Sequence, residues 1–442
     1  MNQPQDPAES QASNNQSSHR KTVAIIGSGI AGMTCAHLLK DQFKVDLYES
    51  ENRLGGHTHT VDVDVKGQTY AIDTGFIVFN DRTYPNFEKL MRRCGVEWQD
   101  TEMSFSVSNR ENGLEYNGHN LDTLFAQRRN LLSPTFYGFV GEILRFNKAA
   151  KAYKNSQQSQ LTLGQFIDNE GFSAYFQKHY LLPMVSAIWS CSLDDARQFP
   201  LSFFLQFFLN HGLLEVKDRP QWRVICGGSS NYIPKLTAGL EDSILLNRPV
   251  DYIVRNEAGH KTPGVEVWSQ NQCQHYDHVI LACHSDQALK LLANPSNDEQ
   301  DILGKMEYQP NQVTLHTDSS RMPENRKAWA SWNVRIGEYS DDNSRPTQVT
   351  YYMNRLQGLD ANCPDFFVSL NQDETIDPAS VLRTFVYHHP VISEASHQAQ
   401  QQWQQISGVD NTHFCGAYWR NGFHEDGVFS ALRVCESLGV SL

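Results

Sequence analysis

Apolar residues occur in short runs along the chain, and their period predicts the order of its elements. Residues 23–26 (VAII) form a continuous apolar run that ends at Gly27, which is typical of a strand buried on both faces. Residues 30–40 have the period of a helix, and residues 44–49 alternate between polar and apolar side chains. The chain therefore begins with a strand–helix–strand unit of a parallel sheet.

The pattern changes further along the chain. Residues 58–65 and 69–79 alternate on either side of a short loop that contains glycine, and this predicts a β-hairpin. From about residue 121 to residue 214 the period is helical, whereas residues 312–369 are rich in strand-forming and aromatic residues. Residues 278–282 (HVILA) repeat the buried-strand pattern, so we expect the chain to return there to the first sheet.

Residues 201–214 (LSFFLQFFLNHGLL) carry four phenylalanines within six positions. The simplest interpretation is a helix buried in the core. The alternative is the wall of a long apolar pocket, or an entrance for a lipid-like substrate. The sequence favours the buried helix and leaves the second interpretation open.

Three glycines follow the first predicted strand with the spacing G-x-G-x-x-G, at positions 27, 29 and 32. This spacing gives a tight turn, a bare backbone for a pyrophosphate and close packing of the next helix, whose N-terminus attracts phosphate. Glu49 ends the second strand, where a carboxylate accepts hydrogen bonds from a ribose. The segment therefore predicts a dinucleotide site.

Composition and charge narrow the classes of partner. A length of 442 residues favours two domains, and the net charge of −13 argues against nucleic acid or an anionic membrane as a partner held by bulk electrostatics. A hydrophobic contact with a membrane stays open. Nine cysteines without C-x-x-C spacing predict reduced thiols in a cytoplasm and no metal site. Residues 1–20 predict a disordered polar tail, and no stretch reaches the roughly 18 to 20 apolar residues of a membrane-spanning helix.

Four separated segments resemble the superfamily of flavin amine oxidases, protoporphyrinogen oxidases and carotenoid desaturases. They are the glycine motif with Glu49, Arg53-x-Gly55-Gly56, Asp73-x-Gly75, and Gly422-Phe-His-Glu-Asp-Gly427 before a last helix. The resemblance implies FAD, bound non-covalently. The first helix would hold the pyrophosphate, and the last helix would direct its amides at the flavin pyrimidine ring.

The fold that this resemblance implies is α/β, with a discontinuous Rossmann-like FAD-binding domain of the GR2 type and an inserted α+β substrate domain. Residues 21–80, 219–290 and 405–442 would form the FAD-binding domain, and residues 81–218 and 291–404 the substrate domain. The implied cofactor-binding residues are Gly27, Ser28, Gly29, Ile30, Ala31, Gly32, Glu49, Ser50, Arg53, Gly55, Gly56, His57, Thr74, Gly75, Phe76, Val250, Ala282, Gly416, Gly422, His424, Glu425, Asp426, Gly427 and Val428.

The sequence departs from the amine oxidases in two places. His57 stands where they usually follow the double glycine with arginine, and residues 312–316 lack the lysine that their substrate-domain sheet carries. Both departures argue against amine oxidation. Hydride removal from an unactivated chain requires a base or a stabilising group. The candidate catalytic residues are His57, His316, Trp332 and Tyr352, each of which also has a purely structural interpretation.

A narrower resemblance concerns predicted NAD/FAD-binding proteins found alone in bacteria and as the N-terminal part of plant cyclopropane fatty acid synthases. Its motifs include Gly55-Gly-His-Thr58, Ala187-Ile-Trp-Ser190 and Trp329-Ala-Ser-Trp-Asn333. It implies an FAD-dependent oxidoreductase that desaturates or reduces an acyl chain by hydride transfer at flavin N5. The alternatives are an oxidase of a small amine and a non-catalytic flavoprotein partner of a lipid methyltransferase. The expected location is the cytoplasm, with contact to the periphery of the inner membrane left open.

Overall fold

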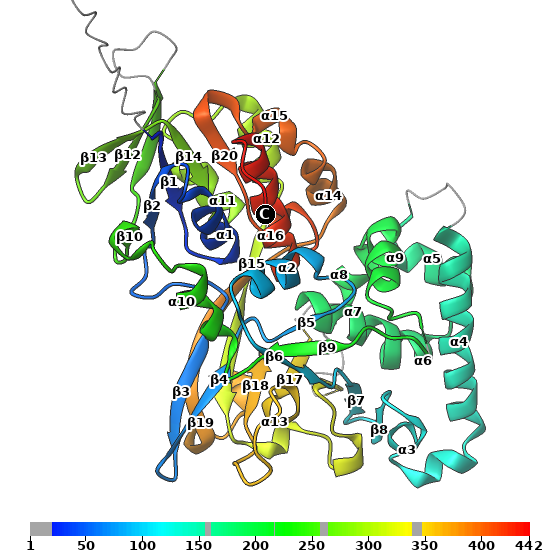
Figure 1. Ribbon diagram of the computed structural model, residues 1–442. Helices are drawn as coiled ribbons and strands as arrows, with labels where there is room; N and C mark the ends of the chain where they lie inside the picture. The colour runs from blue at the N-terminus through cyan, green and yellow to red at the C-terminus, as the bar shows by residue number, and fades with distance from the viewer. Residues whose placement is uncertain (1–19, 155–160, 216, 257–263, 338–346) are drawn as a thin grey trace, which may run out of the picture.

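The computed structural model of the chain describes residues 20–154, 161–215, 217–256, 264–337 and 347–442. Residues 1–19 of the predicted tail lie outside this part. The described chain forms a domain around a parallel sheet, a second domain around a larger mixed sheet, and a group of helices beside the second sheet (Figure 1).

The first domain contains a five-stranded parallel sheet with the order β10–β2–β1–β14–β20. The predicted strand–helix–strand unit is confirmed as β1, α1 and β2, and the predicted return to this sheet is β14, which pairs with β1. The strands are β1 (Thr22–Ile26), β2 (Lys44–Tyr48), β10 (Ile244–Leu245), β14 (His278–Leu281) and β20 (Thr412–Phe414).

Helices cover this sheet, and an antiparallel three-stranded sheet stands beside it (Figure 1). The apolar side chains of the strands and helices share one core, because the strands are apolar on both faces. The helices are α1 (Ile30–Leu39), α2 (Pro85–Arg93), α10 (Ile233–Leu236), α11 (Ser285–Leu291), α12 (Asn297–Gly304), α14 (Glu394–Gln400), α15 (Trp403–Ile406) and α16 (His424–Ser437); the added strands are β11 (Tyr252–Asn256), β12 (Gly264–Ser269) and β13 (Gln272–Tyr276).

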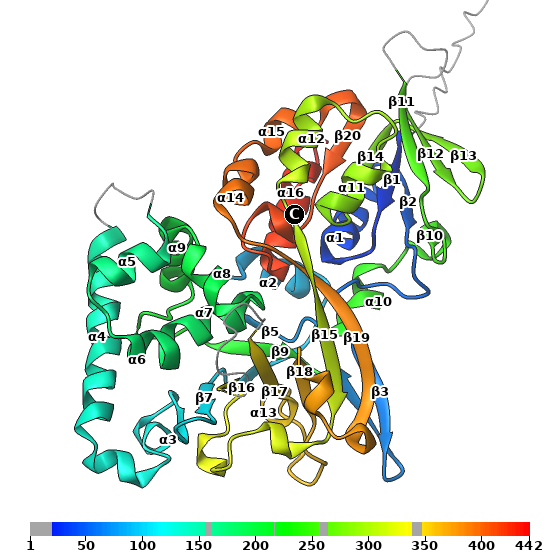
Figure 2. The same ribbon diagram turned by 180° about the vertical axis from the view of Figure 1, so that it is seen from behind.

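The second domain is built on a seven-stranded mixed sheet with the order β19–β15–β18–β17–β16–β7–β8. Its two longest strands, β15 and β19, pair antiparallel and run from the first domain down into this sheet (Figure 2). The strands are β7 (Phe105–Asn109), β8 (Leu114–Asn117), β15 (Tyr308–His316), β16 (Trp332–Ile336), β17 (Gln348–Tyr352), β18 (Phe367–Leu370) and β19 (Val381–Pro390), with the short helix α13 (Met353–Leu356) after β17.

The chain also forms two small sheets. The predicted hairpin is confirmed as β3 (Thr60–Val65) and β4 (Gln68–Asp73), although β4 ends before residue 79, where β5 (Val78–Asn80) has already begun a separate sheet with β9 (Trp222–Ile225) and β6 (Trp98–Thr101). The chain leaves β4 at Asp73 because the following residues turn back against the first domain.

The predicted helical region forms the group of helices at one side of the molecule (Figure 1). In α9 all four phenylalanines are buried, so the interpretation of this segment as a buried helix is confirmed. No helix in the described ranges is both long enough and apolar enough to cross a membrane. The elements are α3 (Leu121–Leu124), the 3-10 helix η1 (Arg128–Leu132), α4 (Pro134–Lys154), α5 (Leu163–Asn169), α6 (Ala174–Phe176), α7 (Leu182–Trp189), α8 (Leu193–Gln198) and α9 (Leu201–Asn210).

Packing groups several segments across the predicted domain boundaries. α2, α12 and α14 fall within the predicted substrate-domain ranges, and α15 crosses the predicted boundary after residue 404, yet the apolar side chains of all four helices lie in the core of the first domain. The β3–β4 hairpin falls within the predicted FAD-binding range, yet Val61, Val63 and Ile72 pack with the mixed sheet. The sequence did not show this, because the boundaries were placed where the pattern changes and not where the cores separate.

Candidate functional site

The three glycines after β1 have different surroundings. Gly27 adopts a φ of +104°, and a Cβ there would lie 3.0 Å from the carbonyl oxygen of Ala282. A Cβ at Gly32 would lie 1.9 Å from the carbonyl oxygen of Gly27. Gly29, in contrast, has a φ of −63° and nothing within 4 Å of an added Cβ. Backbone packing therefore requires Gly27 and Gly32, whereas Gly29 leaves open space at the N-terminus of α1.

The Glu49 carboxylate lies beside this space at the end of β2. Its Oε2 accepts hydrogen bonds from the backbone N–H of Ser28, at 3.1 Å, and from the Ser28 hydroxyl. Its Oε1 accepts from the Ser50 hydroxyl at 3.3 Å and from the backbone N–H of Glu51 at 2.9 Å. The carboxylate is thus fixed next to the glycine loop, where a ribose hydroxyl would find a charged acceptor.

The double-glycine loop closes over the same space. The Arg53 guanidinium donates to the carbonyl oxygens of Gly56, at 2.9 Å, and Thr58, at 3.3 Å, so it holds the loop in shape. Gly55 has a φ of +115°, and an added Cβ at Gly56 would lie 3.2 Å from the Cα of Gly29. The backbone of Gly56 therefore packs close to that of Gly29, and a side chain at Gly56 would press on it.

The turn after β4 continues the wall. An added Cβ at Gly75 would lie 2.1 Å from the carbonyl oxygen of His57, and the Phe76 N–H donates to that oxygen at 2.8 Å. The Thr74 hydroxyl bonds to the carbonyl of His59 and to the Tyr387 hydroxyl. This turn therefore fixes the loop that carries His57.

Asp73, which begins this turn, does not face the space. Its carboxylate accepts from the backbone and hydroxyl of Ser229 and from the Thr60 hydroxyl. Burial raises the pKa of Asp73 to about 6. The carboxylate therefore ties the hairpin to the loop before α10, which explains why a charged residue stands at a buried turn.

The N-terminus of α16 lies beside that of α1, although some 390 residues separate them. An added Cβ at Gly427 would lie 2.8 Å from Cγ2 of Ile30, so the glycine permits this close approach. Gly422, with a φ of +92°, turns the chain into the helix, and Val428 is buried in the core of the first domain. The pairing of two helix N-termini that the resemblance implied is present in the fold.

The charged and polar side chains of α16 contact protein. His424 Nε2 lies 2.8 Å from the Thr58 hydroxyl, and its ring stacks on Phe76 at 3.6 Å. Glu425 accepts from the backbone of Phe87, at 2.9 Å, and from Asn86, so it caps α2. Asp426 accepts from the Phe423 N–H at 2.9 Å, and burial raises its pKa to about 6. The side chains of this turn are therefore engaged by protein, and the amides of Asp426 and Gly427 donate to the carbonyl oxygen of Phe423.

The remaining cofactor candidates border the same region. The Ala282 N–H donates to Ile26, and Gly416 donates to the Ser430 hydroxyl, so both lie in the turns that follow β14 and β20. Val250 packs against the core near the segment whose Arg248 N–H donates to the carbonyl of Glu49. Gly29, Glu49 and these turns lie at the carboxyl ends of the parallel strands, which is where open α/β sheets bind dinucleotides.

Histidine and tyrosine side chains from both domains meet next to His57. We call His57, His284, Tyr308, Tyr387 and His389 the seam cluster. The His57 ring lies 5.9 Å from that of His284, 5.3 Å from Tyr387 and 5.8 Å from His389, and His284 stacks on Tyr308 at 4.2 Å. His389 Nδ1 lies 3.0 Å from Nδ2 of Asn311.

The imidazoles of the seam cluster are uncharged at neutral pH. Burial, followed by the nearby His389, His284, His424 and Arg53, holds the pKa of His57 well below its usual 6.5. Burial and the neighbouring His284 and His388 lower the pKa of His389 to about 4. Burial also lowers the pKa of His284 to about 4, and Asp286 opposes this shift only in part. The Nε2 of His57 is buried and has no hydrogen-bond partner in the described part of the chain.

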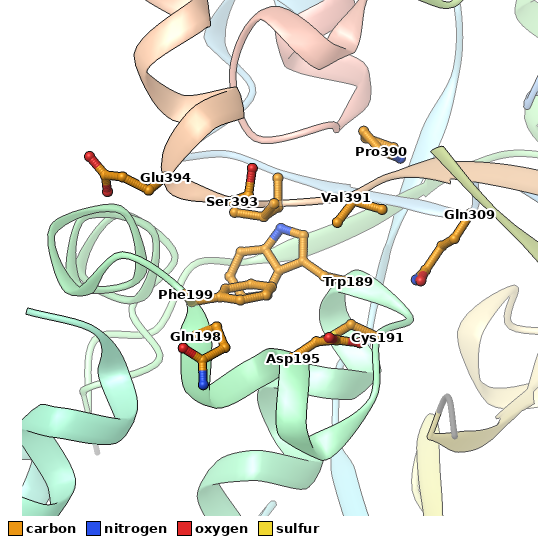
Figure 3. Close-up of a pocket in the computed structure, with 11 residues that line it drawn as sticks. Trp189, Cys191, Asp195, Gln198, Phe199, Gln309, Pro390, Val391, Ser393 and Glu394 are labelled. Atoms are coloured by element: carbon orange, nitrogen blue, oxygen red, sulfur yellow. The ribbon is translucent and has the colours of Figure 1, made fainter. Parts of the chain in front are cut away.

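A cavity of about 240 Å³ opens beside the seam cluster, between α7, α8 and the start of α14 (Figure 3). Its lining includes Gln309 and Pro390, the chain neighbours of Tyr308 and His389. Trp189 lies in the middle of the lining, and its Nε1 has no hydrogen-bond partner within the described residues. The rim carries the exposed carboxylates of Asp195 and Glu394.

The phenylalanines of α9 stand behind this cavity. Phe203 and Phe207 pack on Trp189 with ring centroids 5.6 Å and 4.6 Å apart, and Phe207 also stacks on Phe423 at the start of α16. α9 is thus part of the core, and its phenyl rings pack behind the apolar wall that Trp189 and Phe199 form.

The candidate catalytic residues do not come together. His57 lies in the seam cluster, whereas His316 ends β15 eight residues after Tyr308, which is roughly 27 Å along an extended strand. The His316 ring bonds to the Ser369 hydroxyl and accepts from the Asp318 N–H. Trp332 packs on Tyr351, and the Tyr352 hydroxyl donates to Asp365 at 2.6 Å. The structure thus gives His316, Trp332 and Tyr352 partners within the mixed sheet.

Sequence reasoning missed four members of the seam cluster. The sequence analysis did not single out His284, Tyr308, Tyr387 or His389 as candidates. The alternation of Phe385, Tyr387 and His389 on one face of β19 was the available signal.

Comparisons with known proteins agree with this fold. A family model described as flavin containing amine oxidoreductase matches residues 30–438. The L-amino-acid oxidase of Mus musculus is 21% identical over 399 residues, which are 82% of this chain and 57% of that protein. The chain therefore spans little more than half the length of that relative.

Two solved structures have similar folds. Cyclohexylamine oxidase from Brevibacterium oxydans IH-35A matches with a TM-score of 0.65 and 16% identity over 95% of this chain and 100% of that chain. The CLA-producing fatty acid isomerase from P. acnes matches with a TM-score of 0.66 and 14% identity over 94% of this chain and 98% of that chain. At these identities the likeness shows the fold alone.

Proposed function

Because the chain belongs to the flavin-containing amine oxidoreductase family, whose members are FAD-dependent oxidoreductases, we propose that it desaturates or reduces an acyl chain. The substrate would be a fatty acid or a phospholipid. When bound, FAD supplies the hydride acceptor or donor at N5. The residues of this chain bind the substrate, exclude water and hold the accompanying proton.

The observation that carries this proposal is the charge of the seam cluster. The charged or titratable groups that act on His57 and His389 are all histidine or arginine, whereas the Asp286 carboxylate acts on His284 and Tyr308 at the other side of the cluster. A buried alkylammonium ion next to His57 and His389 would therefore have no acidic group among those that act on these two residues, and burying an unpaired charge is costly. An uncharged hydrocarbon chain needs no counter-ion, so the site suits it better.

His57 is suited to proton transfer in this reaction. Its lowered pKa keeps the imidazole neutral at neutral pH, so that one ring nitrogen is free to accept a proton, and Nε2 has no partner among the described residues. Removing a hydride from a saturated chain leaves a proton on the neighbouring carbon, which a buried neutral imidazole accepts. The same atom would return the proton in the reducing direction.

The cavity beside the seam cluster supports an apolar substrate. Trp189, Phe199 and Ile392 give it a buried apolar floor, and its lining also includes Gln309 and Pro390, which are next to Tyr308 and His389 along the chain. The resemblance to proteins related to the N-terminal part of plant cyclopropane fatty acid synthases, carried in part by Ala187-Ile-Trp-Ser190, agrees with this assignment.

We assign structural roles to His316, Trp332 and Tyr352. Each is engaged by partners within the mixed sheet, and His316 lies at the end of β15 that is remote from His57. A reaction step that used both histidines would need the two groups in contact with one substrate carbon pair.

Oxidation of a small amine is the second candidate. It is favoured by the carboxylates of Asp195 and Glu394 at the cavity rim, which attract a cation, and by the family to which the chain belongs. In that case the amine would lose its proton at the rim before it reached the seam cluster.

Anaerobic spectroscopy of the holoprotein separates these functions. A desaturase predicts that a saturated acyl ester or phospholipid bleaches the oxidised flavin, and a reductase predicts that an unsaturated chain reoxidises the reduced flavin. Bleaching by alkylamines alone would overturn the acyl proposal and support the amine oxidase. Flavin that neither lipids, amines nor NAD(P)H can reduce would favour the non-catalytic partner of a lipid methyltransferase.

A further inference from the structure

Exposed apolar side chains concentrate on one short stretch of the chain. Of the nine large apolar residues that are exposed in the described ranges, five lie between residues 121 and 144. Leu132 is 89% exposed and Leu121 is 75% exposed, which is unusual for leucine in water. We call Leu121, Leu131, Leu132 and Tyr137 the leucine tip.

Regular structure holds the leucine tip outward. The four residues of the leucine tip lie on α3, η1 and the first turn of α4. These elements are at the end of the second domain that is remote from the parallel sheet (Figure 1). The Tyr137 hydroxyl donates to the carbonyl of Leu131 at 3.2 Å, and Phe125 packs against the Tyr137 ring at 5.8 Å. Phe136 and Phe139 are buried beneath it. The leucines are therefore held by well-packed residues beneath them, and no side chain within the described residues covers them.

The charge around the leucine tip is opposite in sign to that of the whole chain. Residues 121–151 contain five lysine and arginine residues and two acidic residues, in a chain whose net charge is −13. Asp122, Glu142 and Glu215 pair with three of the basic residues. Arg129 and Lys148 are exposed and have no acidic partner in the described part of the chain. A net charge computed over 442 residues hides this local excess of positive charge.

A polar hollow adjoins the leucine tip. It has a volume of about 330 Å³, and Arg129, Asn130, Gln127 and Ser133 are among the residues that line it. Asn130 is 7% exposed, and its Nδ2 is buried without a hydrogen-bond partner in the described ranges. A phosphate oxygen in the hollow would satisfy this donor and pair with the Arg129 guanidinium.

We propose that the leucine tip inserts into an anionic lipid surface and that the hollow at Arg129 and Asn130 binds a lipid phosphate. A few exposed apolar side chains next to basic ones, here Arg128 and Arg129, suit the boundary between acyl chains and headgroups. A protein partner would need a contact of roughly 800 Å² with a continuous apolar centre, which four separated side chains do not provide. This inference concerns a surface remote from the seam cluster and holds whatever reaction the flavin performs.

Vesicle sedimentation of the holoprotein tests the leucine tip. We expect it to sediment with phosphatidylcholine vesicles that contain phosphatidylglycerol, and less with phosphatidylcholine alone or at high salt. The double substitution Leu131→Ser and Leu132→Ser should weaken binding at least about tenfold. Val409→Ser, an exposed apolar position in the first domain, is the matched control and should bind as the wild type does. Flavin absorbance and circular dichroism establish that each variant is folded.

Several results would overturn the proposal. One is that the holoprotein does not sediment with any of the vesicles. Another is that Val409→Ser weakens vesicle binding as much as the double substitution does. A third is that light scattering shows a wild-type dimer that the double substitution dissociates. The last result would make the leucine tip an interface between two copies of the chain.

The phosphate hollow has its own test. Two sets of vesicles are prepared with equal negative charge, one from phosphatidic acid and the other from oleic acid. The holoprotein should bind more tightly to the vesicles that contain phosphatidic acid. Arg129→Gln should abolish this difference, whereas Lys290→Gln in the first domain removes one charge and should preserve it. A difference that survives Arg129→Gln would show that the hollow does not recognise phosphate.

Discussion

At the scale of single residues, Glu49 is the most specific contact for the cofactor. Its four hydrogen bonds fix both carboxylate oxygens beside the open space at Gly29. Glu49→Gln should weaken FAD binding roughly 10- to 100-fold, because hydrogen bonds to a charged group contribute about 1.5–3 kcal/mol. Flavin fluorescence titration of the apoprotein measures this. Glu51→Gln changes an exposed neighbour and should leave the affinity unchanged; equal losses in both variants would disprove the assignment.

His57 is the second residue whose role can be isolated. His57→Gln should retain FAD and slow flavin reduction by roughly 10²- to 10⁴-fold, because a buried proton acceptor is lost. In the wild type the rate should fall on the acid side only below pH 6.5, since the pKa of His57 is lowered. Stopped-flow absorbance measures both effects. His388→Gln changes an exposed histidine on the same strand as His389 and serves as the control; a similar loss there would refute a specific role for His57.

Local spacing predicted the contacts within one motif, and the buried-strand pattern and the resemblance predicted two long-range pairings, of β1 with β14 and of α1 with α16, but neither predicted the seam cluster. Gly27, Gly29, Gly32 and Glu49 are neighbours in a single local pattern, so spacing sufficed. The seam cluster joins residues from positions 57, 284, 308, 387 and 389, and each of them is ordinary in its local sequence. Their meeting depends on how β14, β15 and β19 are arranged, which no local pattern encodes.

At the scale of elements, substitutions in the turn between β1 and α1 can distinguish an effect on folding from an effect on FAD binding. Gly29→Ala should leave the thermal midpoint of the apoprotein near that of the wild-type apoprotein and abolish tight FAD binding, because the methyl group meets no protein atom and fills the open space. Gly32→Ala should destabilise the protein by several kcal/mol, since its Cβ would lie 1.9 Å from a carbonyl oxygen. Calorimetry and flavin titration of both variants check this. The opposite pattern would mean that the open space is not where the cofactor binds.

Element types were predicted better than element partners. The strand–helix–strand unit, the hairpin and the buried α9 followed from hydrophobic period alone. The sequence did not predict the lengths of β15 and β19, which extend from one domain into the other. Pro310 interrupts the strand pattern of β15, and polar side chains weaken that of β19. These two strands bring Tyr308 and His389 to the seam cluster.

At the scale of the whole molecule, buried neutral histidines predict acid sensitivity. Burial lowers the pKa of His211, His284, His316, His389 and His413 to about 4 from 6.5. Between these values the unfolded chain binds more protons than the native one, so the free energy of unfolding falls as the pH falls from 6.5 to 4. Asp73 and Asp426, with pKa values raised to about 6, oppose this trend but are fewer.

The same linkage can be tested at one histidine that is remote from the cofactor. His316→Gln removes one group that binds a proton in the unfolded chain but not in the native one. It should therefore reduce the slope of the free energy of unfolding against pH by roughly 1.4 kcal/mol per pH unit near pH 5. Urea titrations of the holoprotein between pH 5 and 6 measure the slope. An unchanged slope would mean that His316 is protonated in the folded protein.

The central claim is that this FAD-dependent oxidoreductase changes the saturation of an acyl chain. The most direct measurement compares extracted lipids, by mass spectrometry, from cells that make the wild type and cells that make Gly29→Ala. We predict that one acyl species differs between them by the mass of two hydrogen atoms, and the sign of that difference gives the direction of the reaction. Identical acyl chains in both extracts, together with bleaching of the purified flavoprotein by a small amine, would contradict the account.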